Sequence, residues 1–459
     1  MSTNKVNSNA IEFPVDGADV PDFERLAPSP TKVEETGLSF DLLGDLVGKH
    51  LLGAGVSTLA ELSSKTMLPG SIIEDVLDFM RKDARIEVLG AGVQQIGMRY
   101  NLTDRGRATA LDAMFRSGYV GPAPVPLERY TEVVREQSVH VRNVTRDMID
   151  ELFADTVVRD EIKSQLGLSM NSGRAVFVYG PAGTGKTYLT SKLAKIFSDT
   201  VLIPYAIQVG DATISVYDPI LHRCVSEQDD GNLMYADNHD ARFAICDRPV
   251  VVSGGELVGE MLDVQFDPAT KEYLAPLQLR ANNGVFIIDD MGRQKVAPEV
   301  IFNRWIVPLE EKTDYLALGS GRHFSVPFDE VLIFSTNLHP LDLADEAFLR
   351  RIGYKIEFPT LEKEEYRSIW ESECEVRDVS CETSLVDYVV DVLHTENAKP
   401  LLPCHPRDLI SIAVDRTVYS NQARELTKQD LDFAWNSYFV ALQKTKADHT
   451  SRAAQEIDQ

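Results

Sequence analysis

The chain has 459 residues, which is too long for one ordinary hydrophobic core and predicts two or three domains. Hydrophobic residues make up 44% and charged residues 25%, the balance of a globular protein, so the composition excludes wholesale disorder. The formal net charge of −25 argues against a chain that coats nucleic acid or an anionic membrane.

The sequence also lacks the usual marks of export and membrane insertion. No apolar run approaches the ~20 residues of a membrane-spanning helix, and the polar start Met1–Asp22 has no apolar signal segment. The 5 cysteines are widely spaced and form no CxxC pair, which argues against a disulfide framework and a structural zinc site. We therefore expect a cytoplasmic protein without a membrane span.

The first part of the chain predicts a tail and a small helical domain. Residues 1–38 are polar and proline-rich, as is typical of a flexible tail. Residues 39–117 predict a winged-helix-like domain, because three helical patterns precede two short alternating runs and a last helix. The expected helices are Asp41–Leu52, Thr58–Ser64, Ser71–Lys82 and Thr103–Arg116, and the expected strands are Arg85–Leu89 and Met98–Leu102 around a loop at Gly90–Gly97.

The rest of the chain divides into a linker, an α/β core and a helical domain. Residues 118–143 begin with the proline-rich stretch Tyr119–Pro126 and predict a stiff linker. In residues 144–360, apolar runs alternate with helical patterns, which predicts an α/β fold with a parallel sheet covered on both faces. The expected strands are Ala175–Tyr179, Val201–Ile207, Val285–Ile288, Val331–Ser335 and Tyr354–Phe358. Residues 361–446 predict an α-helical domain with helices near Glu362–Arg377, Ser384–Glu396, Pro406–Ser420 and Lys428–Lys446, and 447–459 form a second tail.

A phosphate-binding loop follows the first expected strand of the core. Its residues match the pattern GxxxxGK[ST] between a strand and a helix: Gly180, Pro181, Ala182, Gly183, Thr184, Gly185, Lys186 and Thr187, with Tyr188 next in the helix. The glycines let backbone N–H groups point at phosphate oxygens at the start of a helix. Lys186 would neutralise the β- and γ-phosphates, and the Thr187 hydroxyl would bind Mg²⁺. We expect the loop and Tyr188 to bind a nucleotide.

Two carboxylates directly follow another expected strand of the core. Asp289 and Asp290 follow the apolar run Val285–Ile288, and parallel strands end at the same edge of a sheet. The pair should therefore lie beside the phosphate-binding loop. We expect Asp289 to hold the hydrated Mg²⁺, and Asp290 to orient or deprotonate the attacking water.

With these motifs and three later ones, the chain resembles the AAA+ ATPase superfamily over about residues 144–446. Thr336-Asn337 after a strand resembles the family's first sensor, which implies that Asn337 contacts the γ-phosphate or the water. Asp345–Arg351 resembles the arginine-finger segment, which implies that Arg350, or else Arg351, reaches the nucleotide of a neighbouring subunit. His405–Leu409 resembles the second sensor, with Arg407 on the γ-phosphate. The resemblance implies a helical lid at 361–446, ATP and Mg²⁺ as cofactors, and a ring-shaped oligomer, with a hexamer as the expected size.

The sequence departs from this family in two places. Asp290 stands where the family usually has glutamate, so its carboxylate is set back by about 1.5 Å, which predicts slow hydrolysis or another water geometry. The path from Lys186 to Asp289 is also long, and the excess lies in an insertion at 211–283 with a hairpin signal around Asp267–Lys271. This insertion is either a surface elaboration or a loop that faces a partner or the ring pore.

The motifs favour an ATP hydrolase that remodels a protein partner held by residues 39–117. That module carries 9 Lys or Arg against 10 acids, and Glu74, Asp75 and Asp78 would repel phosphates from its third helix, so nucleic acid is the less favoured partner. Two alternatives stay open. One is a DNA-associated ATPase that reads the duplex with the module, using Arg99, Arg105 and Arg107. The other is a nucleotide-gated scaffold that barely hydrolyses ATP.

Overall fold

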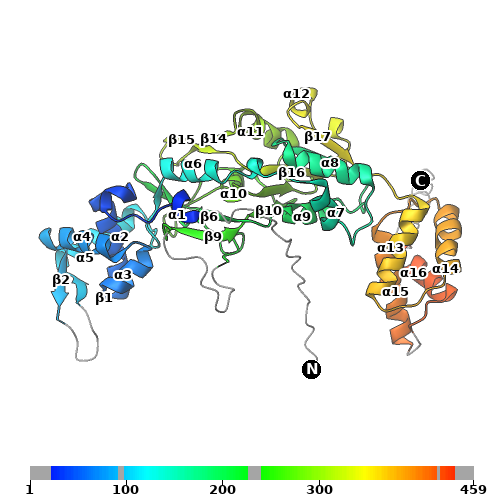
Figure 1. The fold of residues 1–459 in the computed structure, drawn as a ribbon, viewed down its shortest axis with the longest axis horizontal. Helices are drawn as coiled ribbons and strands as arrows, with labels where there is room; N and C mark the ends of the chain where they lie inside the picture. The colour runs from blue at the N-terminus through cyan, green and yellow to red at the C-terminus, as the bar shows by residue number, and fades with distance from the viewer. Residues whose placement is uncertain (1–21, 91–97, 226–238, 421–423, 440–459) are drawn as a thin grey trace, which may run out of the picture.

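The computed structural model describes residues 22–90, 98–225, 239–420 and 424–439. Figure 1 shows three parts in a row: a small helical module, an α/β core and a C-terminal helical part. Four predicted segments lie wholly or largely outside the described residues, namely the start of the first tail at 1–21, the loop at Gly90–Gly97, the end of the lid at 440–446 and the tail at 447–459.

The N-terminal module contains the predicted helices and hairpin, and one further strand. Its elements are α2 (Phe40–Ala54), β1 (Ser57–Thr58), α3 (Leu59–Thr66), α4 (Gly70–Lys82), β2 (Ile86–Leu89), β3 (Arg99–Leu102) and α5 (Asp104–Arg116). β3 pairs with β1 on one side and β2 on the other, both antiparallel. α4 buries Ile72, Ile73, Val76 and Leu77, the apolar stripe of an amphipathic helix. The winged-helix-like character of the module stays a prediction.

Residues 22–38 are packed against the core, which corrects the prediction of a flexible tail as far as residue 38. They contain α1 (Phe23–Leu26) and the 3-10 helix η1 (Val33–Thr36). Phe23 and Ala27 belong to a buried cluster with Val125 and Phe243. The segment is rich in proline and polar residues, but a few apolar side chains fix it because a distant part of the chain offers them a complementary surface.

The interval 118–143 is not a free linker, and this prediction was wrong. Tyr119, Ala123 and Val125 are buried, and the amide of Ala123 donates to the carbonyl of Thr66 at 2.7 Å. β4 (Val125–Pro126) pairs with β7 (Ala206–Val209), and α6 (Leu127–Glu136) buries its apolar face. Both neighbours supply packing partners for this interval, so the module is fixed to the core.

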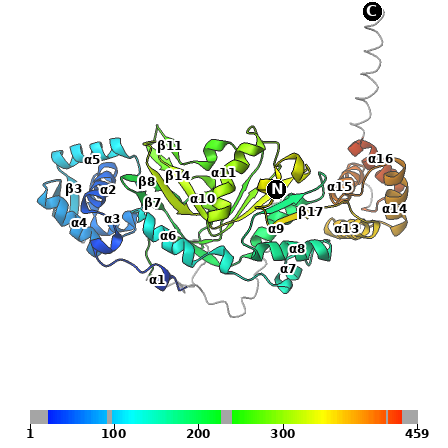
Figure 2. The same cartoon turned by 90° about the horizontal axis from the view of Figure 1, so that it is seen from above.

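A five-stranded parallel sheet forms the centre of the core, as predicted. Its order is β10 (Val250–Ser253), β13 (Val285–Ile288), β16 (Val331–Thr336), β5 (Val176–Tyr179) and β17 (Tyr354–Glu357). α7 (Arg146–Leu152), α8 (Asp160–Asn171) and α9 (Lys186–Leu193) contribute to the cluster on the face of Val176 and Val178. α11 (Pro298–Glu311) covers the opposite face, which carries Phe177 and Phe334 (Figure 2). Both faces are buried, which explains why the strands read as unbroken apolar runs.

Two strand assignments that were predicted from the sequence were wrong. The run Val201–Ile207 divides at Tyr205 into β6 (Thr200–Pro204) and β7, and their ladders lie outside the parallel sheet. The fifth parallel strand is β10, which lies inside the interval 211–283 that was predicted to be an insertion. A β-branched apolar run predicts a buried strand but not its partner, because pairing is decided by residues far away in sequence.

A second, mixed sheet joins the core to the N-terminal module. Its order is β11 (Gln265–Asp267), β12 (Glu272–Leu274), β8 (Ala212–Ser215), β7 and β4. The hairpin predicted around Asp267–Lys271 is confirmed, with Lys271 in the left-handed region at φ 58°. Beside it lie the antiparallel pairs of β6 with β9 (Phe243–Asp247) and of β14 (Thr313–Ala317) with β15 (His323–Pro327). Much of the long path between Lys186 and Asp289 is therefore structured β-sheet.

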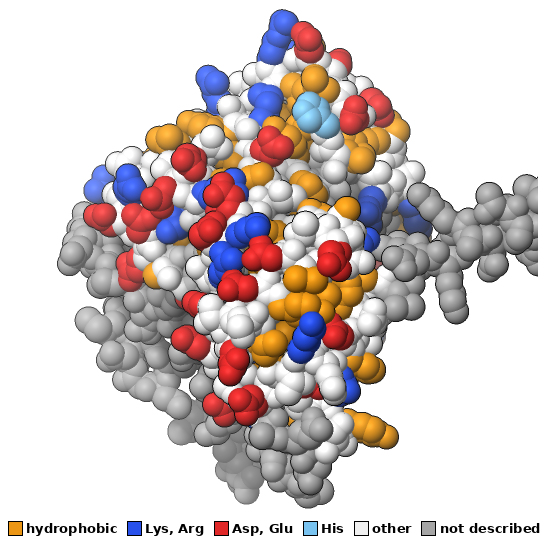
Figure 3. All heavy atoms as spheres, turned by 90° about the vertical axis from the view of Figure 1, so that its right-hand side faces the viewer, with side chains coloured by type: hydrophobic (Ala, Val, Ile, Leu, Met, Phe, Trp, Pro, Cys, Tyr) orange, Lys and Arg blue, Asp and Glu red, His pale blue; other side chains and the backbone are white. Residues whose placement is uncertain are grey.

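The C-terminal part is all helical, as predicted. It contains α13 (Lys363–Val376), α14 (Thr383–Asp387), a π-helical segment (Tyr388–His394), α15 (Cys404–Tyr419) and α16 (Lys428–Phe439) around one buried cluster. Acidic, basic and apolar side chains are interspersed on the end of the molecule formed by this part (Figure 3). None of the helices in the described ranges combines the length and apolar character needed to cross a membrane.

Candidate nucleotide-binding site

The loop after β5 has the backbone that its glycines predict. Gly180, Gly183 and Gly185 have φ of 143°, 86° and 83°, a region that other residues rarely adopt. A Cβ on Gly180 would lie 2.3 Å from the carbonyl oxygen of Phe358, and one on Gly183 would lie 2.7 Å from the Cys404 Sγ of the lid. The loop is therefore packed against β17 and α15, and only glycine fits at these two contacts.

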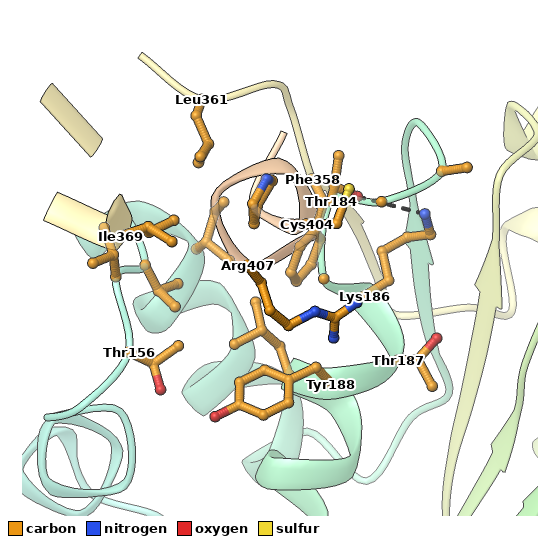
Figure 4. A pocket seen from close by; sticks show the side chains of 18 of the residues that line it. Thr156, Thr184, Lys186, Thr187, Tyr188, Phe358, Leu361, Ile369, Cys404 and Arg407 are labelled. Atoms are coloured by element: carbon orange, nitrogen blue, oxygen red, sulfur yellow. Dashed lines mark hydrogen bonds between the residues drawn. The ribbon is translucent and has the colours of Figure 1, made fainter. Parts of the chain in front are cut away.

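Lys186 lies at the centre of the site, at the start of α9. Its ammonium donates to the carbonyls of Gly180 and Pro181, both at 2.9 Å, and to Asn337 Oδ1 at 2.7 Å. The residue is 6% exposed, and Figure 4 shows its side chain turned toward Thr184. Burial lowers the pKa of Lys186, while the carboxylates of Asp289 and Asp290 act in the opposite direction.

Both predicted carboxylates lie at the same edge of the sheet. The Thr187 hydroxyl donates to Asp289 Oδ2 at 2.7 Å, and Asn337 Nδ2 donates to Asp290 Oδ1 at 3.0 Å. Because β5, β13 and β16 are adjacent and parallel, the residues after each strand meet here. Asn337 thus contacts Lys186 and Asp290 at once, and the lysine, amide and carboxylate form one hydrogen-bonded chain.

The oxygen atoms of Thr187 and Asp289 fit a magnesium ion. Mg²⁺ in nucleotide sites takes one or two protein oxygens and completes its shell with phosphate and water. In the described part of the chain, no group of three or more His, Cys, Asp or Glu side chains could hold a metal ion, so a site made by the protein alone is not indicated there. The two oxygen ligands from Thr187 and Asp289 are the number expected for a Mg²⁺ ion that binds together with a phosphate.

A cavity of about 640 Å³ opens above these residues, between the sheet edge and the lid. This volume lies in the range of small-molecule sites. Arg407 and Cys404 of α15 and Ile369 of α13 line it from the lid, and Tyr188 lines it from α9. Figure 4 shows Arg407 reaching over Tyr188 toward the phosphate-binding loop. The Arg407 guanidinium is bound only loosely, by Asp408 at 3.0 Å, and 61% of its side chain is exposed.

Arg350 and Arg351 do not line this cavity. They follow α12 (Glu346–Leu349), which Figure 1 shows at the upper edge of the core near β17. The Arg350 side chain is 80% exposed and lies 3.4 Å from Glu346, whereas Arg351 bonds Glu310 at 2.6 Å and the carbonyl of Ala347 at 2.7 Å. In this conformation neither arginine reaches the cavity of its own chain.

Several residues that line the cavity were not predicted from the sequence. The segment Asp155–Arg159 before α8 lines it, and Arg159 bonds Glu365 of the lid at 2.6 and 2.8 Å. The hydrogen bond from Arg159 is the main reason that the pKa of Glu365 is lowered. A lone arginine and a lone glutamate some 200 positions apart carry no sequence signal, because only the fold brings them together.

A buried histidine, His405, lies beside Arg407 in the lid. His405 is 4% exposed, and its Nδ1 is buried without a hydrogen-bond partner in the described structure. Burial, with a smaller contribution from His394, lowers its pKa from 6.5 to about 4, while Asp408 acts in the opposite direction. The folded chain thus keeps His405 neutral where the unfolded chain protonates it.

This histidine should make the unfolding free energy fall as the pH drops below 6.5, and the loss should continue to about pH 4. Between pH 7 and pH 5 its contribution to the loss should be about 2 kcal/mol. Urea unfolding at both pH values would show a smaller loss in His405→Gln than in the wild type. The exposed His323 supplies the matched control, His323→Gln. An identical pH dependence in all three proteins would contradict the assignment.

Comparisons with known proteins give a family match for the lid and fold likenesses for the core. A family model described as a domain of unknown function, DUF8689, matches residues 362–437. No curated protein sequence matches the chain.

Three solved structures illustrate the fold likenesses. The Thermotoga maritima RuvB Holliday junction branch migration motor is 14% identical at a TM-score of 0.35, covering 61% of this chain and 69% of that one. Domain III of the Thermotoga maritima replication initiation protein DnaA is 13% identical at 0.34, covering 62% and 95%. NtrX from Brucella abortus is 14% identical at 0.38, covering 70% and 65%.

The AAA+ resemblance continues to rest on the motifs, and the structure shows where those motifs lie. The parallel sheet carries the phosphate-binding loop after β5, the acidic pair after β13 and Asn337 after the adjacent β16, and a helical lid follows β17. These positions are the ones that the resemblance implies.

Proposed function

We propose that the chain is a Mg²⁺-dependent ATP hydrolase of the AAA+ type. One observation carries this proposal: Lys186, Asn337 and Asp290 form a hydrogen-bonded chain beside the Thr187–Asp289 pair, at the mouth of a cavity lined by the lid arginine. The set supplies a cation for phosphate, oxygens for a metal and a carboxylate for water, which are the parts that phosphoryl transfer to water needs.

Each side chain has a distinct role in this proposal. The backbone amides of the loop and the Lys186 ammonium hold the phosphates and stabilise the charge that spreads over them during transfer. Thr187 and Asp289 hold Mg²⁺, which would neutralise phosphate charge when bound. Asp290 accepts a proton from water or orients it, and Asn337 fixes the Asp290 carboxylate with its amide. Arg407 senses the γ-phosphate from the lid.

Substituting Asp290 tests hydrolysis separately from binding. Asp290→Asn should bind MgATP with an affinity close to that of the wild type but turn over at least ~100-fold more slowly, because the amide cannot accept the proton. Asparagine also tolerates the left-handed backbone of this position, φ 49°. Steady-state phosphate release with and without EDTA measures the effect, and undiminished turnover in the variant would contradict the role.

The Asp290→Glu variant distinguishes an ATPase from a slow scaffold. The proposal expects glutamate to hydrolyse no faster than the wild type, because the surrounding bonds are built around aspartate. A clear gain in turnover would instead favour a nucleotide-gated scaffold that is tuned for slow hydrolysis.

We further propose that the active form is a ring of identical subunits, with Arg350 as the trans-acting finger. Its guanidinium is exposed and only weakly engaged, whereas Arg351 is tied to Glu310 and to a backbone carbonyl. An arginine that must reach a neighbouring subunit has to be free in the single chain, which favours Arg350. Hexameric size and a cytoplasmic location also belong to this proposal.

A protein partner fits the N-terminal module better than DNA does. Arg85 faces Asp41, Asp45 and Asp83, and Arg105 pairs with Asp83, so these cations are already neutralised by carboxylates within the module. Free lysines and arginines are what phosphate contacts require. We therefore propose that residues 39–117 hold a protein that the ATPase core remodels. Because the module is fixed to the core, domain motions should be transmitted to that partner directly.

A further inference from the structure

The turn that carries the two carboxylates has an unusual backbone. Directly after β13, Asp290 has φ 49° and Gly292 has φ 100°. A residue other than glycine in the left-handed region persists only where its surroundings hold it there. The orientation of the Asp290 carboxylate therefore depends on the contacts that fix this turn.

Gln294 makes a set of such contacts with both ends of its side-chain amide. Its Oε1 accepts from the amide of Gly292 at 2.8 Å. Its Nε2 lies within hydrogen-bond distance of the carbonyls of Asp289 at 3.2 Å, Asp290 at 3.3 Å and Gly254 at 3.2 Å. The Gln294 side chain thus forms hydrogen bonds within the turn and connects the turn to the loop that follows β10.

Other hydrogen bonds hold the turn to β16 and fix the loop that follows β10. The amide of Met291 donates to the carbonyl of Ser335, and the Thr336 hydroxyl donates to the carbonyl of Met291 at 2.7 Å, which hold the turn to β16. On the β10 side, Glu256 fixes the loop by accepting from the amide of Gly254 at 2.7 Å. Gln294 is the side chain that connects this fixed loop to the carbonyls of both aspartates.

We infer that Gln294 is a positioning residue for the hydrolytic step, which sets the backbone of Asp289 and Asp290 and thereby aims the Asp290 carboxylate at the attacking water. It does not line the described cavity, so it acts through the aspartates rather than on the nucleotide. The inference rests on the proposed ATPase function. No residue type is prescribed here by the family motifs quoted above, and the assignment comes from the hydrogen bonds alone.

Gln294→Met tests the inference because methionine keeps the length and volume of the side chain but loses the hydrogen bonds of the amide. We expect kcat for MgATP to fall about 10- to 100-fold, since a misplacement near 1 Å costs about that much. KM and the affinity for ADP should change less than about threefold, because the phosphate-binding loop is untouched. Lys295→Met, at the exposed neighbouring position, is the control and should behave as the wild type.

Hydrogen exchange gives a readout that does not depend on turnover. Peptides that cover residues 289–294 should exchange faster in Gln294→Met, while peptides of the lid should not. Wild-type kcat in Gln294→Met would overturn the inference. A wild-type chain that neither binds nor hydrolyses ATP would overturn the proposed function instead, and the exchange measurement would still decide whether Gln294 holds the turn.

A second variant guards against a folding defect. Gln294→Glu keeps the acceptor for Gly292 but cannot donate to the three carbonyls. If the donated bonds position the aspartates, its kcat should fall as in Gln294→Met in a protein that circular dichroism shows to be folded. A folded Gln294→Glu protein with wild-type kcat would show that the donor end of the amide is irrelevant and would overturn the assignment.

Discussion

Lys186→Met should weaken ATP binding by about 100-fold or more, because a buried ammonium that contacts phosphate oxygens makes charge-assisted bonds in a site that excludes water. Methionine keeps most of the side-chain volume, so the loop should still pack. The bonds from the ammonium to Gly180, Pro181 and Asn337 would be lost.

Calorimetric titration of the purified chain with ATP and Mg²⁺ measures this effect. Lys195→Met is the matched control, because Lys195 is an exposed lysine in the 3-10 turn that follows the same helix. Equal affinity in Lys186→Met and in the wild type would refute the nucleotide site itself, together with the ATPase proposal. A loss that appears equally in Lys195→Met would point to a nonspecific effect of charge.

Arg350→Ala should leave ATP binding unchanged and lower kcat by about 1000-fold, the scale of an arginine finger. The exposed guanidinium makes only one weak contact in its own chain, so its removal should cost little stability. Arg351→Ala should affect stability more than turnover. It breaks the ion pair with Glu310 and a bond to the Ala347 carbonyl, so we expect a lower melting temperature and a smaller change in turnover.

Mixing two inactive variants tests whether the arginine acts between subunits. Arg350→Ala supplies an intact nucleotide site, and Lys186→Met supplies an intact finger. Mixed oligomers should therefore regain part of the wild-type turnover. Size-exclusion chromatography must first show that the variants assemble, and a mixed assembly without any recovered activity would contradict the trans-acting role of Arg350.

The local arrangement of the candidate site could be predicted from the sequence. The phosphate-binding loop, the acidic pair, Asn337 and the helical lid lie where the motifs placed them, and the hairpin around Asp267–Lys271 is confirmed. Each of these features is encoded within a short stretch: a glycine pattern sets a backbone, and an apolar period sets a helix or a buried strand.

The sequence by itself determined the kind of most elements and the residues that make up the candidate site. Only the tertiary structure decided that β10 completes the parallel sheet, that Phe23 closes a buried cluster, and that Arg159 meets Glu365 across the cavity. Strand pairing, burial and ion pairs depend on which distant residues become neighbours. That choice is made by the packing of the whole chain and leaves no local pattern to read.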